Sequence, residues 1–169
     1  SDLFLKKGDY DNAVAYLTKS IDAKDKKTMD DYDNLGTLYA DIAASKTKAG
    51  DNAGAADAFK KADEVFAKMI EEFPNYKNYG NYMRAQVNAN LDPDSKKGLA
   101  LPYYEELANS LESKAERAAS ETQMLKQAYF YLMVYQFNIK KDKASAKEYA
   151  AKLLQIDPEN EAAKQVQKL

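Results

Sequence analysis

One stretch of the sequence decides the fold, Tyr32-Asp33-Asn34-Leu35-Gly36-Thr37-Leu38-Tyr39. Its apolar side chains recur at steps of three and four residues with polar side chains between them, which is the period of an amphipathic helix. Gly36 lies on the apolar face, where the lack of a side chain lets a neighbouring helix approach closely. The stretch therefore predicts a helix packed tightly against a partner helix.

The same helical period extends over the rest of the chain. No stretch alternates between apolar and polar residues with a period of two, and residues that end or start helices fall at intervals between the periodic segments. Helices joined by such short connections pack as antiparallel pairs. The sequence thus predicts an all-α fold with helices over residues 9–23, 29–48, 52–72, 76–90, 95–114, 117–139, 143–155 and 159–168.

A longer pattern surrounds the first stretch. Tyr32-x-x-Leu35-Gly36-x-x-Tyr39 is followed by Ala55-x-x-x-Phe59 and Ala62-x-x-x-Phe66, and Pro74 closes the unit. This pattern resembles that of the tetratricopeptide repeat family, with tyrosine in place of the usual tryptophan. The resemblance is to bacterial members and covers nearly the whole chain. It implies a superhelix of antiparallel helical hairpins that ends in a capping helix.

The resemblance divides residues 1–169 into the repeats of one α-solenoid domain. The stretches from Tyr39 to Gly50 and from Gly50 to Pro74 each contain seven more residues than the repeat needs, which is nearly two helical turns. We therefore expect an elongated hairpin, with Gly50 left-handed in its turn. The expected order is a partial repeat at 1–27, the elongated repeat at 28–74, a divergent repeat at 75–115, a further repeat at 116–158 and a capping helix at 159–169.

The divergent repeat leaves two points open. Tyr79-x-x-Tyr82-Met83 replaces the usual Leu-Gly pair, so the sequence does not fix the register of this repeat. Pro102 forbids an unbroken helix around it. Either the helix begins near Gly98, with Pro102 in its first turn, or the helix is kinked.

The chain starts inside a helical pattern. Leu3, Phe4 and Leu5 are followed at once by a Gly8-Asp9 turn, which leaves an apolar surface without the helix that should precede it. We expect the chain to be a C-terminal piece of a longer protein. We also expect that self-association can occur through this truncated apolar edge.

Composition excludes several classes of site. The 169 residues contain no cysteine and no histidine, which removes thiolate nucleophiles, zinc-finger-type sites and the commonest general base. The formal net charge is −2, so no bulk positive field would attract nucleic acid. No segment reaches the roughly 20 apolar residues needed to span a bilayer. We expect no nucleic-acid partner and no membrane insertion of this segment.

The acidic clusters have structural explanations. Asp30, Asp31 and Asp33 lie at the start of a predicted helix, where carboxylates cap the helix and interact favourably with its dipole. Asp92-x-Asp94 could begin a calcium loop, but lysines stand where a further ligand and the turn glycine are expected, so we interpret Asp92 as a cap. We predict that the chain is not an enzyme and holds no cofactor and no metal.

Candidate binding residues follow from the resemblance. In the tetratricopeptide repeat family the first helices of the hairpins line a concave groove. The best-known subclass captures a C-terminal carboxylate there with Lys, Asn and Arg, whereas the aspartates of this chain would repel a carboxylate and favour a mixed or basic segment. The residues that would line the groove here are Asp33, Thr37, Asp41, Arg84, Asn88, Tyr131, Tyr135 and Asn138.

Tyr131 and Tyr135 are the strongest of these candidates because they lie one helical turn apart on one strip. A tyrosine offers a broad apolar face together with a hydroxyl group, which suits binding. We expect both rings to be partly exposed, while Phe130, Met133 and Phe137 are buried on a different strip. The alternative is that the two tyrosines are half-buried between neighbouring hairpins.

The predicted function is that of a non-enzymatic scaffold that binds a peptide or protein partner in its concave groove. One alternative is a structural or oligomerisation segment of a larger cell-envelope repeat protein. Another is a module that binds a glycan or small ligand through the tyrosine- and asparagine-rich stretch 75–90. The style of the sequence favours a bacterial source, and the periplasm or cell envelope over the cytoplasm. The identity of the partner does not follow from the sequence.

Overall fold

The computed structural model describes residues 9–169 and is helical throughout its regular elements. The all-α prediction is confirmed. The chain forms two compact units, the first ending at Leu91 and the second comprising Asp92–Leu169. The predicted apolar edge at Leu3, Phe4 and Leu5 lies outside the described residues.

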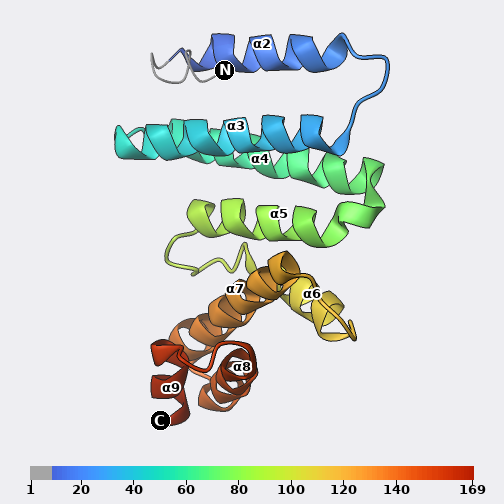
Figure 1. The fold of residues 1–169 in the computed structure, drawn as a ribbon. Helices are drawn as coiled ribbons and strands as arrows, with labels where there is room; N and C mark the ends of the chain where they lie inside the picture. Colours follow the sequence, from blue (N-terminus) through green and yellow to red (C-terminus); the bar gives the residue numbers. More distant parts are fainter. Residues whose placement is uncertain (1–8) are drawn as a thin grey trace. The chain divides into compact units, whose positions relative to one another are not determined.

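The described part of the first unit, residues 9–91, contains four α-helices (Figure 1). Most of the predicted boundaries are correct to within one or two residues, and those of the elongated hairpin are met at both ends of both helices. The helices of this unit are α2 (Tyr10–Asp22), α3 (Met29–Lys48), α4 (Asn52–Glu72) and α5 (Lys77–Leu91), with the short 3-10 helix η1 (Pro74–Tyr76) before α5.

The second unit contains the remaining helices, which differ more from the prediction. The helix predicted over 95–114 begins later, because residues 92–100 form a loop held by a side chain, and Pro102 then lies in the first turn of the helix. The helix predicted over 117–139 changes to a π-helix near its end. The elements are α6 (Leu101–Glu112), α7 (Ala119–Tyr135), the π-helix η2 (Gln136–Lys140), α8 (Lys143–Ile156) and α9 (Glu161–Gln167).

Side-chain caps explain several of the helix starts. The carboxylate of Asp51 accepts a hydrogen bond from the backbone N–H of Gly54, and the carboxylate of Asp142 accepts one from Ser145. The side-chain oxygen of Asn160 accepts one from the N–H of Ala163. Each cap satisfies one of the backbone N–H groups that the first turn of a helix leaves without a partner.

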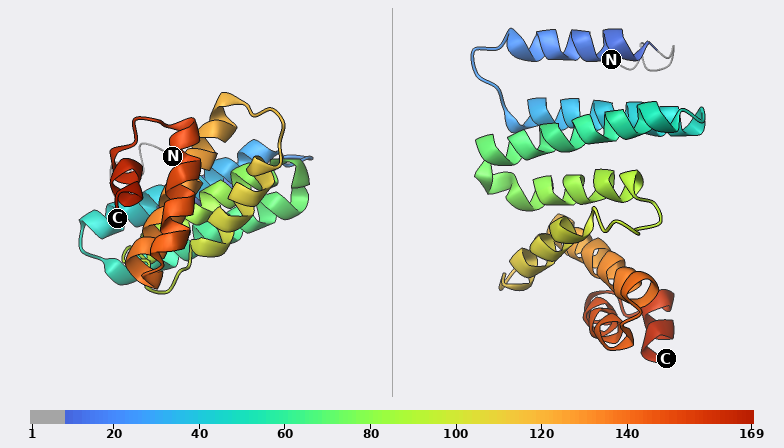
Figure 2. Two further views of the ribbon diagram at one scale, coloured as in Figure 1. Left: turned by 90° about the horizontal axis from the view of Figure 1, so that it is seen from below. Right: turned by 180° about the vertical axis from the view of Figure 1, so that it is seen from behind.

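The elongated hairpin of α3 and α4 is continuous helix on both sides of its turn, as the sequence predicts (Figure 2). Gly50 closes it with a φ of +80°, so its predicted left-handed conformation is confirmed. Gly36 makes the predicted close approach, because a Cβ atom at this position would lie 2.6 Å from the ring of Phe66 in α4. Both Phe66 and Ala62 are fully buried at this contact.

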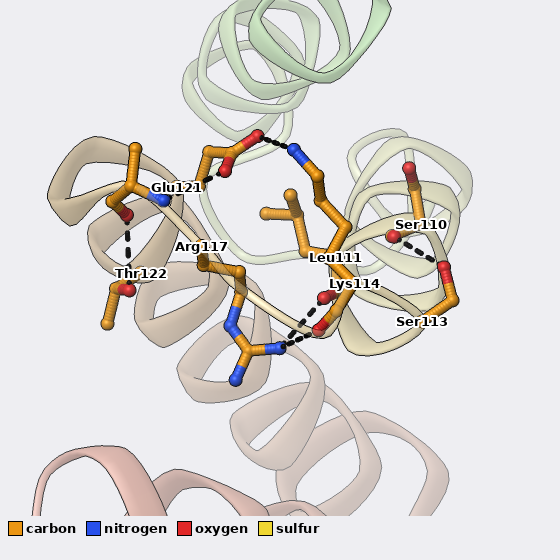
Figure 3. Close-up of polar contacts among 8 residues, drawn as sticks. Ser110, Leu111, Ser113, Lys114, Arg117, Glu121 and Thr122 are labelled. Carbon is orange, nitrogen blue, oxygen red and sulfur yellow. Dashed lines mark hydrogen bonds and ion pairs between the residues drawn. The ribbon is translucent and has the colours of Figure 1, made fainter.

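The connection between α6 and α7 is fixed by polar contacts (Figure 3). The guanidinium of Arg117 donates to the backbone oxygens of Leu111 and Lys114, at 2.9 and 3.2 Å, where the end of α6 leaves carbonyl groups without helical partners. The carboxylate of Glu121 accepts from the N–H of Ala118 at 3.0 Å and also pairs with Lys114. These contacts set the direction in which α7 leaves the turn.

The core of the second unit forms around α7, which packs against α6 on one side and α8 on another. Its largest fully buried side chains are Leu107, Leu111, Leu125, Leu132, Met133 and Leu153. None of the helices within residues 9–169 is both long and apolar enough to cross a membrane.

Candidate functional site

The outward face of α7 forms one side of an open pocket of about 410 Å³ in the second unit. The apolar walls are Tyr104 from α6, Phe130, Tyr131 and Val134 from α7, and Leu153 from α8. Phe130 leaves 44% of its surface exposed, although it is a large apolar residue in the middle of a helix. A concave apolar surface with a few polar groups at its edge is the usual form of a binding site.

Stacked tyrosines support one wall of the pocket. The ring of Tyr131 lies 4.6 Å from that of Tyr104 and 6.0 Å from that of Tyr135, measured between ring centroids. Burial raises the pKa of Tyr131, so its hydroxyl stays neutral at physiological pH. The ring of Tyr131 is thus held between two others, and its position is set before any partner binds.

The loop over residues 92–100 holds the far end of this stack. The buried carboxylate of Asp92 accepts hydrogen bonds from the backbone N–H groups of Lys97 and Gly98, both at 2.9 Å. Gly98 has a φ of +66°, and a Cβ atom there would lie 2.8 Å from the hydroxyl oxygen of Tyr135. The carboxylate of Asp92 therefore holds the backbone of a loop and does not cap a helix that begins at Pro93. Only a glycine at position 98 lets that loop approach Tyr135.

Polar residues also line the pocket and form its rim. Lys126 from α7 pairs with Asp157 at the end of α8, with 3.2 Å between Nζ and Oδ2. The side-chain amide of Asn160 donates to the same carboxylate oxygen at 3.3 Å. The hydrogen bond from Asn160, together with the positive charge of Lys126, lowers the pKa of Asp157. The two charges on the rim are therefore paired with each other.

Comparison with solved structures supports the family suggested by the motifs. A crystal structure of the C-terminal part of a TPR repeat-containing protein from Cytophaga hutchinsonii matches this chain with a TM-score of 0.70 and 28% sequence identity. The chain has a tetratricopeptide-like fold. The match covers 99% of this chain and 57% of that chain, so this chain spans little more than half of its length. No protein-family profile and no curated protein sequence matches.

A tetratricopeptide-like fold generally serves as a protein-interaction module and is typically non-enzymatic.

The contacts of Gly80 indicate a register for residues 75–115, which the sequence leaves open. Gly80 lies one residue after Tyr79, and a Cβ atom there would lie 2.4 Å from the side chain of Ile70 in α4. Gly80 thus makes a close helix contact like that of Gly36, with Tyr76 and Met83 at the flanking positions of the motif.

Three of the predicted groove residues in the first unit bind other side chains of that unit. The hydroxyl of Tyr79 donates to Asp33 at 2.8 Å, and burial, followed by this contact, raises the pKa of Tyr79. Arg84 donates to both carboxylate oxygens of Asp63, at 2.8 and 2.9 Å. Asn88 donates to Asp63 as well, at 2.8 Å. These contacts tie α5 to α3 and α4.

Two further predicted groove residues of the first unit lie at positions 37 and 41 of α3. Thr37 is half-buried and Asp41 is exposed. They lie one helical turn apart on α3, and Asp33 lies one turn before Thr37, so the three share one side of the helix.

The burial expected along α7 and η2 agrees with the structure at some positions and differs at others. Tyr131 is half-buried and lines the pocket, and Asn138 is exposed in η2. Met133 is buried as expected, and Phe137 is half-buried. Two expectations were wrong: Tyr135 is buried, and Phe130 is exposed. The cause is that α7 packs with a different face inward, which turns Phe130 to the pocket and Tyr135 to the loop at Gly98.

Within residues 9–169, no cluster of three or more acidic side chains could hold a metal ion. The sequence reasoning did not identify Lys126, Asp157 or Asn160 as members of one site. Their only signal in the sequence is Asp157-Pro158-Glu159-Asn160, which predicts a helix stop followed by a cap. The same two side chains that end α8 and start α9 thus also form the rim of the pocket.

Proposed function

We propose that the chain is a non-enzymatic scaffold that binds a segment of a partner protein, and that the partner binds at the α7 pocket. The observation that carries the proposal is the exposed ring of Phe130 at the wall of a pocket with a preformed shape. Large apolar side chains that remain exposed and line a concave surface mark interaction sites.

Other exposed apolar side chains among the described residues do not offer such a surface. Tyr16, Tyr76 and Leu169 are as exposed as Phe130 or more so, but none of them lines the α7 pocket. Single exposed apolar residues are normal on protein surfaces. A cluster of aromatic side chains around a pocket is more typical of the centre of an interface.

The predicted groove residues divide into two roles in this proposal. Tyr131 lines the α7 pocket and contacts the partner directly. Asp33, Arg84 and Asn88 have a structural role within the first unit, because their hydrogen bonds hold α5 against α3 and α4. Tyr135 supports Tyr131 by stacking.

The proposal can be tested by selecting binders from a displayed library of random peptides and measuring the affinity of each by fluorescence anisotropy. We expect Phe130→Ser to weaken the binding of the selected peptides by about 10- to 100-fold, as loss of a central aromatic contact does. Tyr76→Ser is the matched control, because Tyr76 is 45% exposed and lies outside the pocket. A library that yields no binder, or only binders whose affinity Phe130→Ser does not change, would contradict the proposal.

A further inference from the structure

We infer that the α7 pocket is selective for an uncharged aromatic side chain on the partner segment. The inference rests on the proposed function and adds the chemistry of the group that is bound. It follows from three features of the pocket: its paired charges, its aromatic walls and its fixed shape.

The charges at the rim disfavour a charged occupant. Lys126 and Asp157 form an ion pair with each other, and Asn160 donates a further hydrogen bond to Asp157. A carboxylate or ammonium group that entered the pocket would lose its hydration and find no unpaired opposite charge there. The charge pattern of the pocket therefore complements a group that carries no charge.

The walls favour an aromatic ring over an aliphatic side chain. Phe130, Tyr131 and Tyr104 come from two helices and contribute three rings to one pocket. Aromatic pairs in offset or edge-to-face geometry gain about 0.5–1.5 kcal/mol beyond the area that they bury. By that measure a phenyl group should bind about 2- to 13-fold more tightly than an aliphatic group of similar size.

The shape of the pocket is fixed without a partner. Tyr131 is held between Tyr104 and Tyr135, and Tyr135 packs on the loop that Asp92 organises. A wall that is already in place saves the conformational entropy of ordering it on binding. This preorganisation lets small differences in ring contacts appear as differences in affinity.

The test uses four capped amino acids as probes, the N-acetyl amides of phenylalanine, leucine, glutamate and lysine. Each is titrated into the whole chain with labelled methyl groups, and the NMR shifts of Val134 and Leu153, which line the pocket, are followed. We expect the phenylalanine probe to shift both methyl signals at the lowest concentration. The leucine probe should need a concentration about 2- to 13-fold higher, and the charged probes should cause no shift.

Variants make the test specific to the pocket. Phe130→Ser should abolish the response to the phenylalanine probe, and Tyr76→Ser should leave it unchanged. Asp157→Asn leaves Lys126 without its carboxylate partner and should let the glutamate probe bind. Lys126→Gln leaves Asp157 without its ammonium partner and should let the lysine probe bind. Opposite gains from these two variants cannot arise from a merely structural role of the pair.

The inference is overturned if the leucine probe binds as tightly as the phenylalanine probe, if a charged probe binds the unaltered chain, or if no probe shifts the two signals. These outcomes are separate from a failure of the proposed function. That failure would appear in the peptide selection as the absence of any binder, whereas the capped amino acids report on the pocket alone.

Discussion

At the scale of single residues, two glycines of the elongated hairpin are required for different physical reasons. Gly36 lies in the middle of α3, where a side chain would overlap the ring of the fully buried Phe66. A Cβ atom at Gly50 would have open space around it, but the φ of +80° is one that other residues adopt only with strain. Substitution therefore tests packing at Gly36 and backbone conformation at Gly50.

We expect Gly36→Val to lower the free energy of unfolding by about 1–3 kcal/mol, because the added atoms overpack the contact with Phe66. Urea denaturation followed by circular dichroism measures the loss. The matched control is Asn34→Val on the exposed face of the same helix, which should change stability by no more than about 0.5 kcal/mol. Equal effects of the two substitutions would show that α3 and α4 do not approach as closely as described.

At Gly50 the expected loss depends on the residue that replaces it. Gly50→Val should cost about 1–2 kcal/mol, since a β-branched residue is strained in the left-handed region. Gly50→Asn should cost less, because asparagine enters this region more readily. The same denaturation experiment compares the two variants. A loss for asparagine as large as that for valine would indicate a steric cause, which the open space around Gly50 does not provide.

At the scale of helices, the sequence predicts boundaries better than faces. The limits of α3 and α4 follow from local chemistry, because capping side chains and Gly50 stop and start helices whatever lies nearby. The inward face of α7 does not follow, because the run Ala128–Tyr135 is apolar at every position and so has no amphipathic period. Only packing against α6 and α8 decides that Leu132 is buried and Phe130 exposed.

The cap at the start of α3 predicts that stability depends on pH. The ion-pair hydrogen bond from Lys24, followed by the hydrogen bond from the N–H of Thr28, lowers the pKa of the buried Asp31. A carboxylate with a lowered pKa contributes stability that is fully present above its unfolded pKa, about 4. That contribution is lost as the pH falls through the lower pKa of the folded state.

We therefore expect the free energy of unfolding of Asp31→Asn to fall less steeply with decreasing pH than that of the unaltered chain. The range to compare is roughly pH 5 to pH 2, over which carboxylates titrate. Denaturation at a series of pH values measures both slopes. Asp25→Asn, an exposed position in the connection before α3, should keep the slope of the unaltered chain. If Asp31→Asn gave that same slope, the cap would make no contribution linked to protonation.

At the scale of the whole molecule, the motifs around Gly36 predict the repeat fold, but they do not predict the pocket. The motif positions describe contacts within a hairpin, and these are local in sequence. The pocket combines Tyr104, Phe130 and Asp157, which lie far apart in sequence and are brought together only by the packing of the second unit. Whether residues 1–169 form one continuous solenoid domain stays a prediction.

We expect the second unit, Asp92–Leu169, to fold when it is produced without the first unit. It is longer than the roughly 55–65 residues at which many domains fold alone, and its own helices supply the buried side chains around Leu132. The isolated segment should show a helical circular dichroism spectrum and a cooperative thermal transition. Leu132→Ala should lower its stability by about 2–5 kcal/mol, because it leaves a cavity in the core. Phe130→Ser, two residues away, should leave the transition nearly unchanged, since that ring faces the pocket. An unfolded segment would show that these helices depend on residues 1–91, and equal losses from the two substitutions would show that Phe130 belongs to the core.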